Sequence, residues 1–181
     1  NPTPGIWRIR VYNSLYLRGE YHLWLPSRGF ISDDTFFLRP SPDTVVTEPG
    51  NASQPITAGA FNHRSGGIYI HSSRGYTRLG RVKPDLVAPG VNVDGPGIQG
   101  TAGFPMRSMT GTSVAAAHTA GAAANLLSWA FRKGNISYMN TSVAKTYLIR
   151  GAERKPVFTY PNREWGYGTL DLYEAFLRLR E

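Results

Sequence analysis

A serine lies between a glycine-threonine pair and a run of small residues in the segment SMTGTSVAAAHTAGAAANLL, residues 108–127. Alanine has the highest helix propensity, so Ser113 is predicted to lie in the first turn of a helix. Backbone N–H groups in a first turn have no partner within the helix, and the helix dipole favours negative charge there. A hydroxyl in this position could attack a carbonyl carbon, with nearby N–H groups stabilising the resulting oxyanion. The structural alternative is that Ser113 is simply the N-cap of a buried helix.

The elements that must position Ser113 follow from the pattern of residues 55–176. Short apolar segments, typical of buried strands, are PITAGAFN, GGIYIHSS and RVKPDLVAPGV. Helices are predicted at Val114–Trp129, at TSVAKTYLIRGA with Thr141 or Ser142 as its cap, and at TLDLYEAFLRLR. Strands that alternate with helices indicate an α/β layered fold.

The first 47 residues have a different pattern, in which short aromatic segments are separated by Gly, Pro, Ser and Asp. The segments are IWRIRVYN, GEYHLWLP and DTFFLRP. They are typical of an antiparallel sheet, but so few strands cannot close a sandwich by themselves. We therefore predict two domains: residues 1–47, the end of a larger β module, and residues 48–181, which carry the α/β pattern.

Composition narrows the classes of function. The chain has 181 residues, 41% of them hydrophobic, and no cysteine, which excludes disulfides and thiolate chemistry. No apolar run reaches the roughly 18 residues of a membrane span, and no acidic cluster or motif indicates a metal or a cofactor. The net charge of +8 would permit nucleic-acid binding. We expect no nucleic-acid binding, because the basic residues are scattered and no nucleic-acid motif is present. The two groups of basic residues that would best support such binding are Arg78, Arg81, Lys83 and Arg150, Arg154, Lys155.

Four segments resemble the subtilisin-like serine proteases (subtilases) in the order in which that family has them. GTSVAAAHTAGAAANLL is similar to the nucleophile motif, KPDLVAPGVNV and PITAGAFN to the two segments before it, and WGYGTLDLYEAF to the C-terminal end. The resemblance implies the C-terminal part of a subtilisin-like, parallel-sheet, three-layer α/β fold with Ser113 as the nucleophile. Ala117 stands where the family usually has proline, and His118 matches the structural histidine of the family's helix.

The other groups of a serine protease site lie upstream of the nucleophile in this family, each in its own glycine-containing motif. The histidines and aspartates that could be considered for these roles here lack such a motif around them; they are His22, His63, His71, Asp33, Asp34 and Asp43. Asn51 lies too close to the PITAGAFN segment to match the oxyanion asparagine. The resemblance therefore implies that the histidine, the aspartate and the asparagine come from an N-terminal companion fragment of the same protease.

Within the subtilases, the chain most resembles the germination-associated Csp-type enzymes of clostridia and their relatives. Those proteins carry a jelly-roll insertion before the PITAGAFN segment, which implies that residues 1–47 are the end of such an insertion. The resemblance implies that the protein is a secreted or spore-associated bacterial endopeptidase that acts on proteins. It also implies that this chain is the C-terminal piece of an enzyme severed within its insertion. Two alternatives are an inactive pseudoprotease that serves as a scaffold in spore germination, and a carbohydrate- or protein-binding β module, which leaves the helix motif unexplained.

Overall fold

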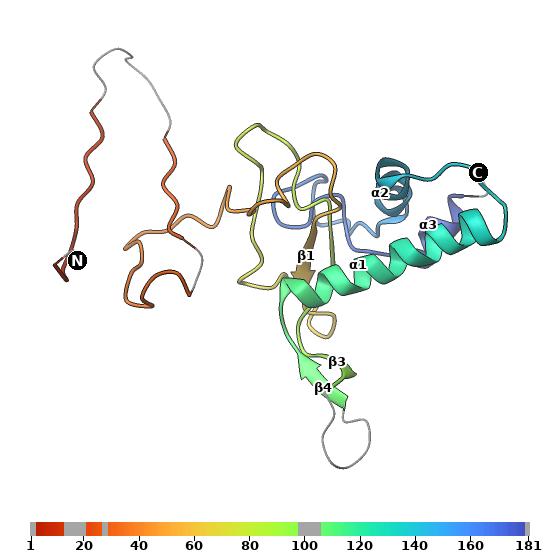
Figure 1. The fold of residues 1–181 in the computed structure, drawn as a ribbon, viewed down its shortest axis with the longest axis horizontal. Coiled ribbons are helices and arrows are strands. Elements are labelled where there is room, and N and C mark those ends of the chain that lie inside the picture. The colour runs from red at the N-terminus through yellow and green to blue at the C-terminus, as the bar shows by residue number, and fades with distance from the viewer. Residues whose placement is uncertain (1–2, 13–20, 27–28, 98–105, 180–181) are drawn as a thin grey trace. The chain divides into compact units, whose positions relative to one another are not determined.

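The computed structural model describes residues 3–12, 21–26, 29–97 and 106–179. The chain divides into two units, residues 1–39 and residues 40–181. Every helix and strand that the structure assigns to the described residues lies in the second unit (Figure 1).

A small parallel sheet lies at the centre of the second unit. Strand β1 (Ala58–Phe61) pairs in parallel with β2 (Leu86–Pro89), so that Ala60 lies opposite Ala88. Thr169 extends this sheet, because it forms a parallel bridge with Val87. The parallel pairing confirms the predicted α/β class. The strand predicted at GGIYIHSS is reduced to a single antiparallel bridge between Phe61 and Ile68, within a segment of turns.

A second pair of strands leads into the longest helix. Strand β3 (Val93–Pro96) pairs antiparallel with β4 (Met106–Met109), and α1 (Thr112–Leu127) follows β4 after two residues. Helix α1 continues into a short π-helix, η1 (Ser128–Arg132), and Gly134 follows with a left-handed φ of 67°, a conformation common just beyond the end of a helix.

Two shorter helices complete the second unit. Helix α2 (Thr141–Gly151) is capped by Asn140, whose side-chain oxygen accepts a hydrogen bond from the Val143 N–H at 2.9 Å. The cap predicted at Thr141 or Ser142 was therefore wrong by one or two residues. Helix α3 (Leu172–Leu177) is capped by Asp171 in the same way.

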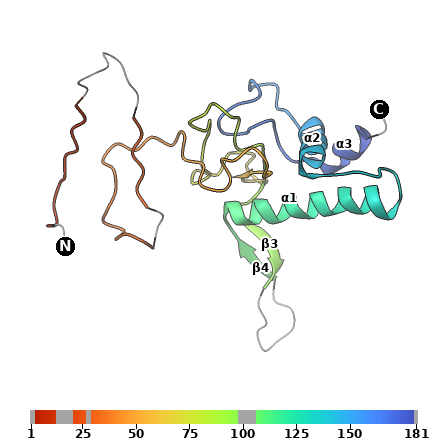
Figure 2. The same ribbon diagram turned by 45° about the horizontal axis from the view of Figure 1, so that its top comes forward.

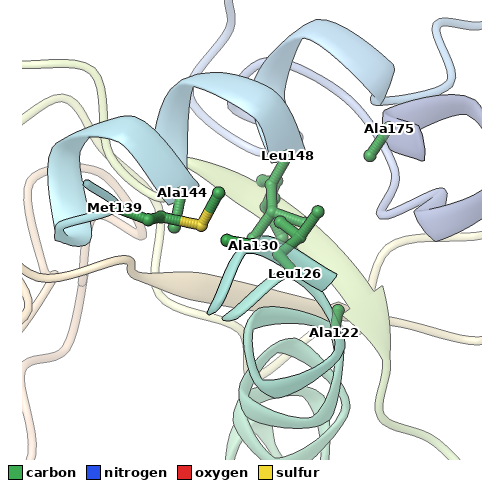
Figure 3. Close-up of a cluster of buried hydrophobic side chains, with 8 residues drawn as sticks. Ala122, Leu126, Ala130, Met139, Ala144, Leu148 and Ala175 are labelled. Carbon is green, nitrogen blue, oxygen red and sulfur yellow. The ribbon is translucent and has the colours of Figure 1, made fainter. Parts of the chain in front are cut away.

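The main hydrophobic core lies where α1, α2 and α3 meet the sheet (Figure 3). Its fully buried members include Leu86 of β2, Leu126 of α1 and Leu148 of α2. A smaller cluster of Ala60, Ala88 and Ala115 joins the first turns of α1 to the sheet. Alanine at all three positions allows the helix to approach the strands closely, which fixes the end of α1 that carries Ser113.

The first unit forms neither strands nor helices in its described residues, 3–12, 21–26 and 29–39. The strands predicted there are absent from the described residues; Asn13 of the first segment and Gly19 and Glu20 of the second lie outside them. Many large apolar side chains of this unit are exposed, including Ile6 at 86% and Phe30 at 86%. A strand needs a neighbour to pair its backbone groups and to cover its apolar face. The jelly-roll insertion therefore stays a prediction.

A buried ion cluster fixes the start of β2. The Lys83 ammonium group donates hydrogen bonds to the Asp85 carboxylate at 2.8 Å, to the Pro55 carbonyl at 2.8 Å and to the Thr57 hydroxyl at 3.0 Å. Lys145 of α2 lies 3.4 Å from the other Asp85 oxygen. Burial lowers the pKa of Lys145, while the Asp85 carboxylate acts in the opposite direction. Lys83 is only 2% exposed, so it does not belong to a basic surface patch.

We expect Asp85→Asn to destabilise the fold by about 3–5 kcal/mol, because it leaves a buried lysine without its counter-ion. The free energy of unfolding, measured by urea denaturation, checks this. Asp94→Asn is the control, since its carboxylate is 57% exposed and lies 3.6 Å from Arg64; such a pair contributes at most about 1 kcal/mol. Equal free energies of unfolding for the two variants would contradict a buried ion pair between Lys83 and Asp85.

Candidate active site

Ser113 is the second residue of helix α1, and its side chain is exposed. The N-cap is Gly111, with φ 154° and ψ 161°, and no side chain caps the helix. The alternative that Ser113 is the N-cap is therefore wrong. Within the part of the chain that the structure describes, no group hydrogen-bonds to the Ser113 hydroxyl. The site thus presents a free hydroxyl beside the unpaired N–H groups of a helix N-terminus.

The turn into α1 is held against the parallel sheet by two glycines. The Gly111 N–H donates to the Gly90 carbonyl at 2.8 Å, and the Gly90 N–H donates to the Phe61 carbonyl at 3.0 Å. A Cβ atom on Gly90 would lie 2.6 Å from the Ala60 Cβ and 2.8 Å from the Gly111 carbonyl oxygen. Only glycine fits at position 90, and this close approach locates the start of α1 relative to β1.

The β3–β4 hairpin also ends at this turn, and Figure 2 shows it projecting from the N-terminal end of α1. Asn92 and Thr110 lie at its base, immediately before β3 and after β4. The Thr110 hydroxyl accepts a hydrogen bond from the Asn92 N–H at 2.9 Å and donates one to the Asn92 side-chain oxygen at 3.3 Å.

No histidine within the described ranges forms a hydrogen bond to Ser113. The His118 Nδ1 atom lies 3.0 Å from the Val114 carbonyl oxygen of its own helix. His22 stacks on Trp24, with ring centroids 5.3 Å apart, and His71 packs edge-on against Tyr69. The first turn of α1 thus offers an exposed hydroxyl and backbone N–H groups, and no histidine of the described residues is hydrogen-bonded to that hydroxyl.

One face of helix α1 is buried and the other is exposed. The buried residues are Ala115, Thr119, Ala122 and Leu126. The exposed residues of the small-residue face are Ala116, Ala117, Ala120, Gly121 and Ala124. Within the described residues, only the face toward the sheet and the neighbouring helices is covered.

Other polar side chains of the second unit make local structural contacts. Asp94 pairs with Arg64, and Asp171 caps α3. The Asn51 side chain donates to Glu48 at 2.8 Å within its own loop. No group of three potential metal ligands occurs among the described residues. Over the same residues, no helix is both long and apolar enough to cross a membrane.

The sequence analysis singled out Ser113 as the candidate nucleophile, which stays a prediction, and it did not consider Asn92 or Thr110. These two residues are 18 positions apart, and only the pairing of Val93 with Met109 brings them together. The available signal was indirect: each lies next to a glycine-containing turn, in APGVN and MTGTS.

Comparison with known proteins assigns residues 38–168 to the subtilase family. The membrane-bound transcription factor site-1 protease of Mus musculus is 38% identical over 138 residues, which are 73% of this chain and 12% of that protein. The CspB protease of Clostridium perfringens matches in structure with a TM-score of 0.73 and 32% identity, over 81% of this chain and 31% of that chain. The prenylagaramide maturation protease PagA, 22% identical with a TM-score of 0.60, shares the fold. The chain thus spans about an eighth of the curated relative and less than a third of the CspB chain.

Proposed function

This chain belongs to the subtilase family, and we propose that it is the C-terminal, nucleophile-bearing part of a subtilisin-like serine endopeptidase that acts on protein substrates. One observation carries the proposal. The Ser113 hydroxyl is exposed and unpartnered within the described residues, in the first turn of a helix that glycines fix against the parallel sheet.

The proposed reaction is acyl transfer through Ser113. The serine oxygen attacks the peptide carbonyl carbon while a histidine of the companion fragment takes the hydroxyl proton. The Ser113 backbone N–H is one donor to the oxyanion, and an asparagine of the companion is the other. Collapse of the intermediate expels the amine, which receives the proton from the histidine. Water then hydrolyses the acyl ester on Ser113 and restores the hydroxyl.

The companion fragment has a surface to bind. The exposed small-residue face of α1 continues to Leu127 and Phe131, whose side chains are 39% and 53% exposed. Small apolar residues permit another element to approach the helix closely, and covering them removes apolar surface from water. The matching region is only 31% of the CspB chain, so a longer protein has ample sequence to cover this face.

The resemblance to the germination-associated Csp-type enzymes noted in the sequence, together with the structural likeness to the CspB protease, supports an association with bacterial spores. We propose that residues 1–47 are the end of a jelly-roll insertion and that the whole protein is secreted or spore-associated. An inactive scaffold on the same fold is the second candidate, favoured by the lack of a base near Ser113 within the described residues. The two candidates differ in the reactivity of Ser113.

Labelling with a fluorophosphonate probe tests the proposal. The chain is produced together with the preceding part of its protein, and the probe is expected to phosphonylate the Ser113 oxygen, because only a serine activated by a base reacts rapidly. Mass spectrometry of the tryptic peptides locates the label. A folded complex in which Ser113 remains unlabelled would refute the peptidase and favour the scaffold.

A further inference from the structure

The two ends of the β3–β4 hairpin are joined by side chains just outside the strand ladder. The last backbone pair of the ladder is Val93 with Met109, and the next pair outward is Asn92 with Thr110. The Thr110 hydroxyl makes two hydrogen bonds to Asn92, one as acceptor and one as donor. Asn92 has a left-handed φ of 49°, a conformation that asparagine tolerates better than most residues.

This pair lies next to the turn that starts α1. One residue beyond Thr110, the Gly111 N–H donates to the Gly90 carbonyl, and Ser113 follows two residues later. Gly111 has φ 154°, and glycine has access to many other backbone conformations. The Gly111 hydrogen bond restrains the peptide that joins Thr110 to Gly111. The Asn92 contacts restrain the Thr110 side chain as well, so that the two together limit movement of the chain just before Gly111.

We propose that Asn92 and Thr110 are a positioning pair, which holds the Gly111 turn so that the Ser113 oxygen and the helix N–H groups face the same carbonyl. The proposal rests on the peptidase function argued above. Both side chains are exposed, so their hydrogen bonds contribute little to global stability. Their effect is on geometry, and displacement of a reacting group by about 1 Å can cost on the order of 100-fold in rate.

Kinetics of the assembled enzyme test the positioning role. Thr110→Val removes the hydroxyl and keeps the branched shape, and we expect kcat and the rate of fluorophosphonate labelling to fall about 10- to 100-fold with little change in KM. Thr110→Ser is expected to restore most of both rates, because it returns the hydroxyl. Thr146→Val in α2 is the matched control, since that exposed threonine also makes a local hydrogen bond, to the Ser142 carbonyl. Wild-type rates in Thr110→Val would overturn the proposal.

Amide hydrogen exchange on the same complexes separates this proposal from the proposed function. Thr110→Val is expected to speed exchange of the Gly111 N–H about tenfold or more, the factor that 1.4 kcal/mol of lost protection gives, while the amide of Leu126 is unchanged. A wild-type complex that takes no label at Ser113 overturns the peptidase, and Gly111 exchange then decides whether the pair fixes the turn. Unchanged Gly111 exchange overturns the positioning pair, whatever the wild-type activity.

Discussion

Ser113→Ala is expected to lower kcat of the assembled enzyme by about a million-fold, because a serine peptidase that loses its nucleophile loses the acyl-enzyme route. This corresponds to about 8 kcal/mol of barrier at 1.36 kcal/mol per decade. The measurement is turnover of a general protein substrate, such as casein, with and without the variant. Activity of Ser113→Ala near that of the wild type would show that another group carries the chemistry.

The same substitution is expected to leave folding almost unchanged. The Ser113 hydroxyl is exposed and has no hydrogen-bond partner in the described residues, so its removal should alter stability by no more than about 0.5 kcal/mol. Ser142→Ala is a matched control, because Ser142 is also exposed and is the second residue of its helix, α2. Loss of activity confined to position 113, with equal melting temperatures, separates a chemical role from a structural one.

Features that depend on neighbouring residues in sequence were predictable. The alanine run has high helix propensity and forms α1, while LVAP lies between proline-containing turns and forms β2. The place of Ser113 in the first turn of α1 was predictable because it depends only on neighbouring residues, whereas its role as nucleophile stays a prediction. Strands β1 and β2 are joined by a long connection, which allows them to run in the same direction and to pair in parallel.

Features that depend on distant partners were not predictable. The GGIYIHSS segment alternates as a strand does, but Gly67 and Ile68 meet only the end of β1, so a turn forms after one bridge. Asn140 displaced Thr141 as the cap of α2 because the chain enters that helix one residue earlier. The Asn92–Thr110 pair needs the β3–β4 pairing before its side chains meet. The neighbouring Lys83 and Asp85 likewise reach Pro55 and Thr57 only once β1 and β2 have paired.

The exposed face of α1 is a further feature that the local sequence did not predict. Its small residues are typical of a buried helix, and the described residues cover only the side that faces the sheet. Among the described residues 40–97 and 106–179, nothing covers the other side, and this open face is the surface to which the proposed companion fragment would bind. Under the proposed function, a companion fragment that covers the N-terminal part of this face would lie close to Ser113, the second residue of the helix, where the proposal requires a base.

Without a companion fragment, the chain is expected to show no Ser113-dependent hydrolysis, and addition of the preceding part of the protein is expected to restore it. A base must reach within about 3 Å of the serine oxygen, whereas the His118 ring is directed to the Val114 carbonyl and no other described histidine contacts Ser113. The measurement is turnover of casein by the purified chain before and after addition, with Ser113→Ala as the blank in both states. Restored turnover shows that the purified chain was competent to assemble, so its earlier inactivity reflects a missing group rather than damage. Serine-dependent turnover before any addition would place the base within these 181 residues and rule out the two-part enzyme.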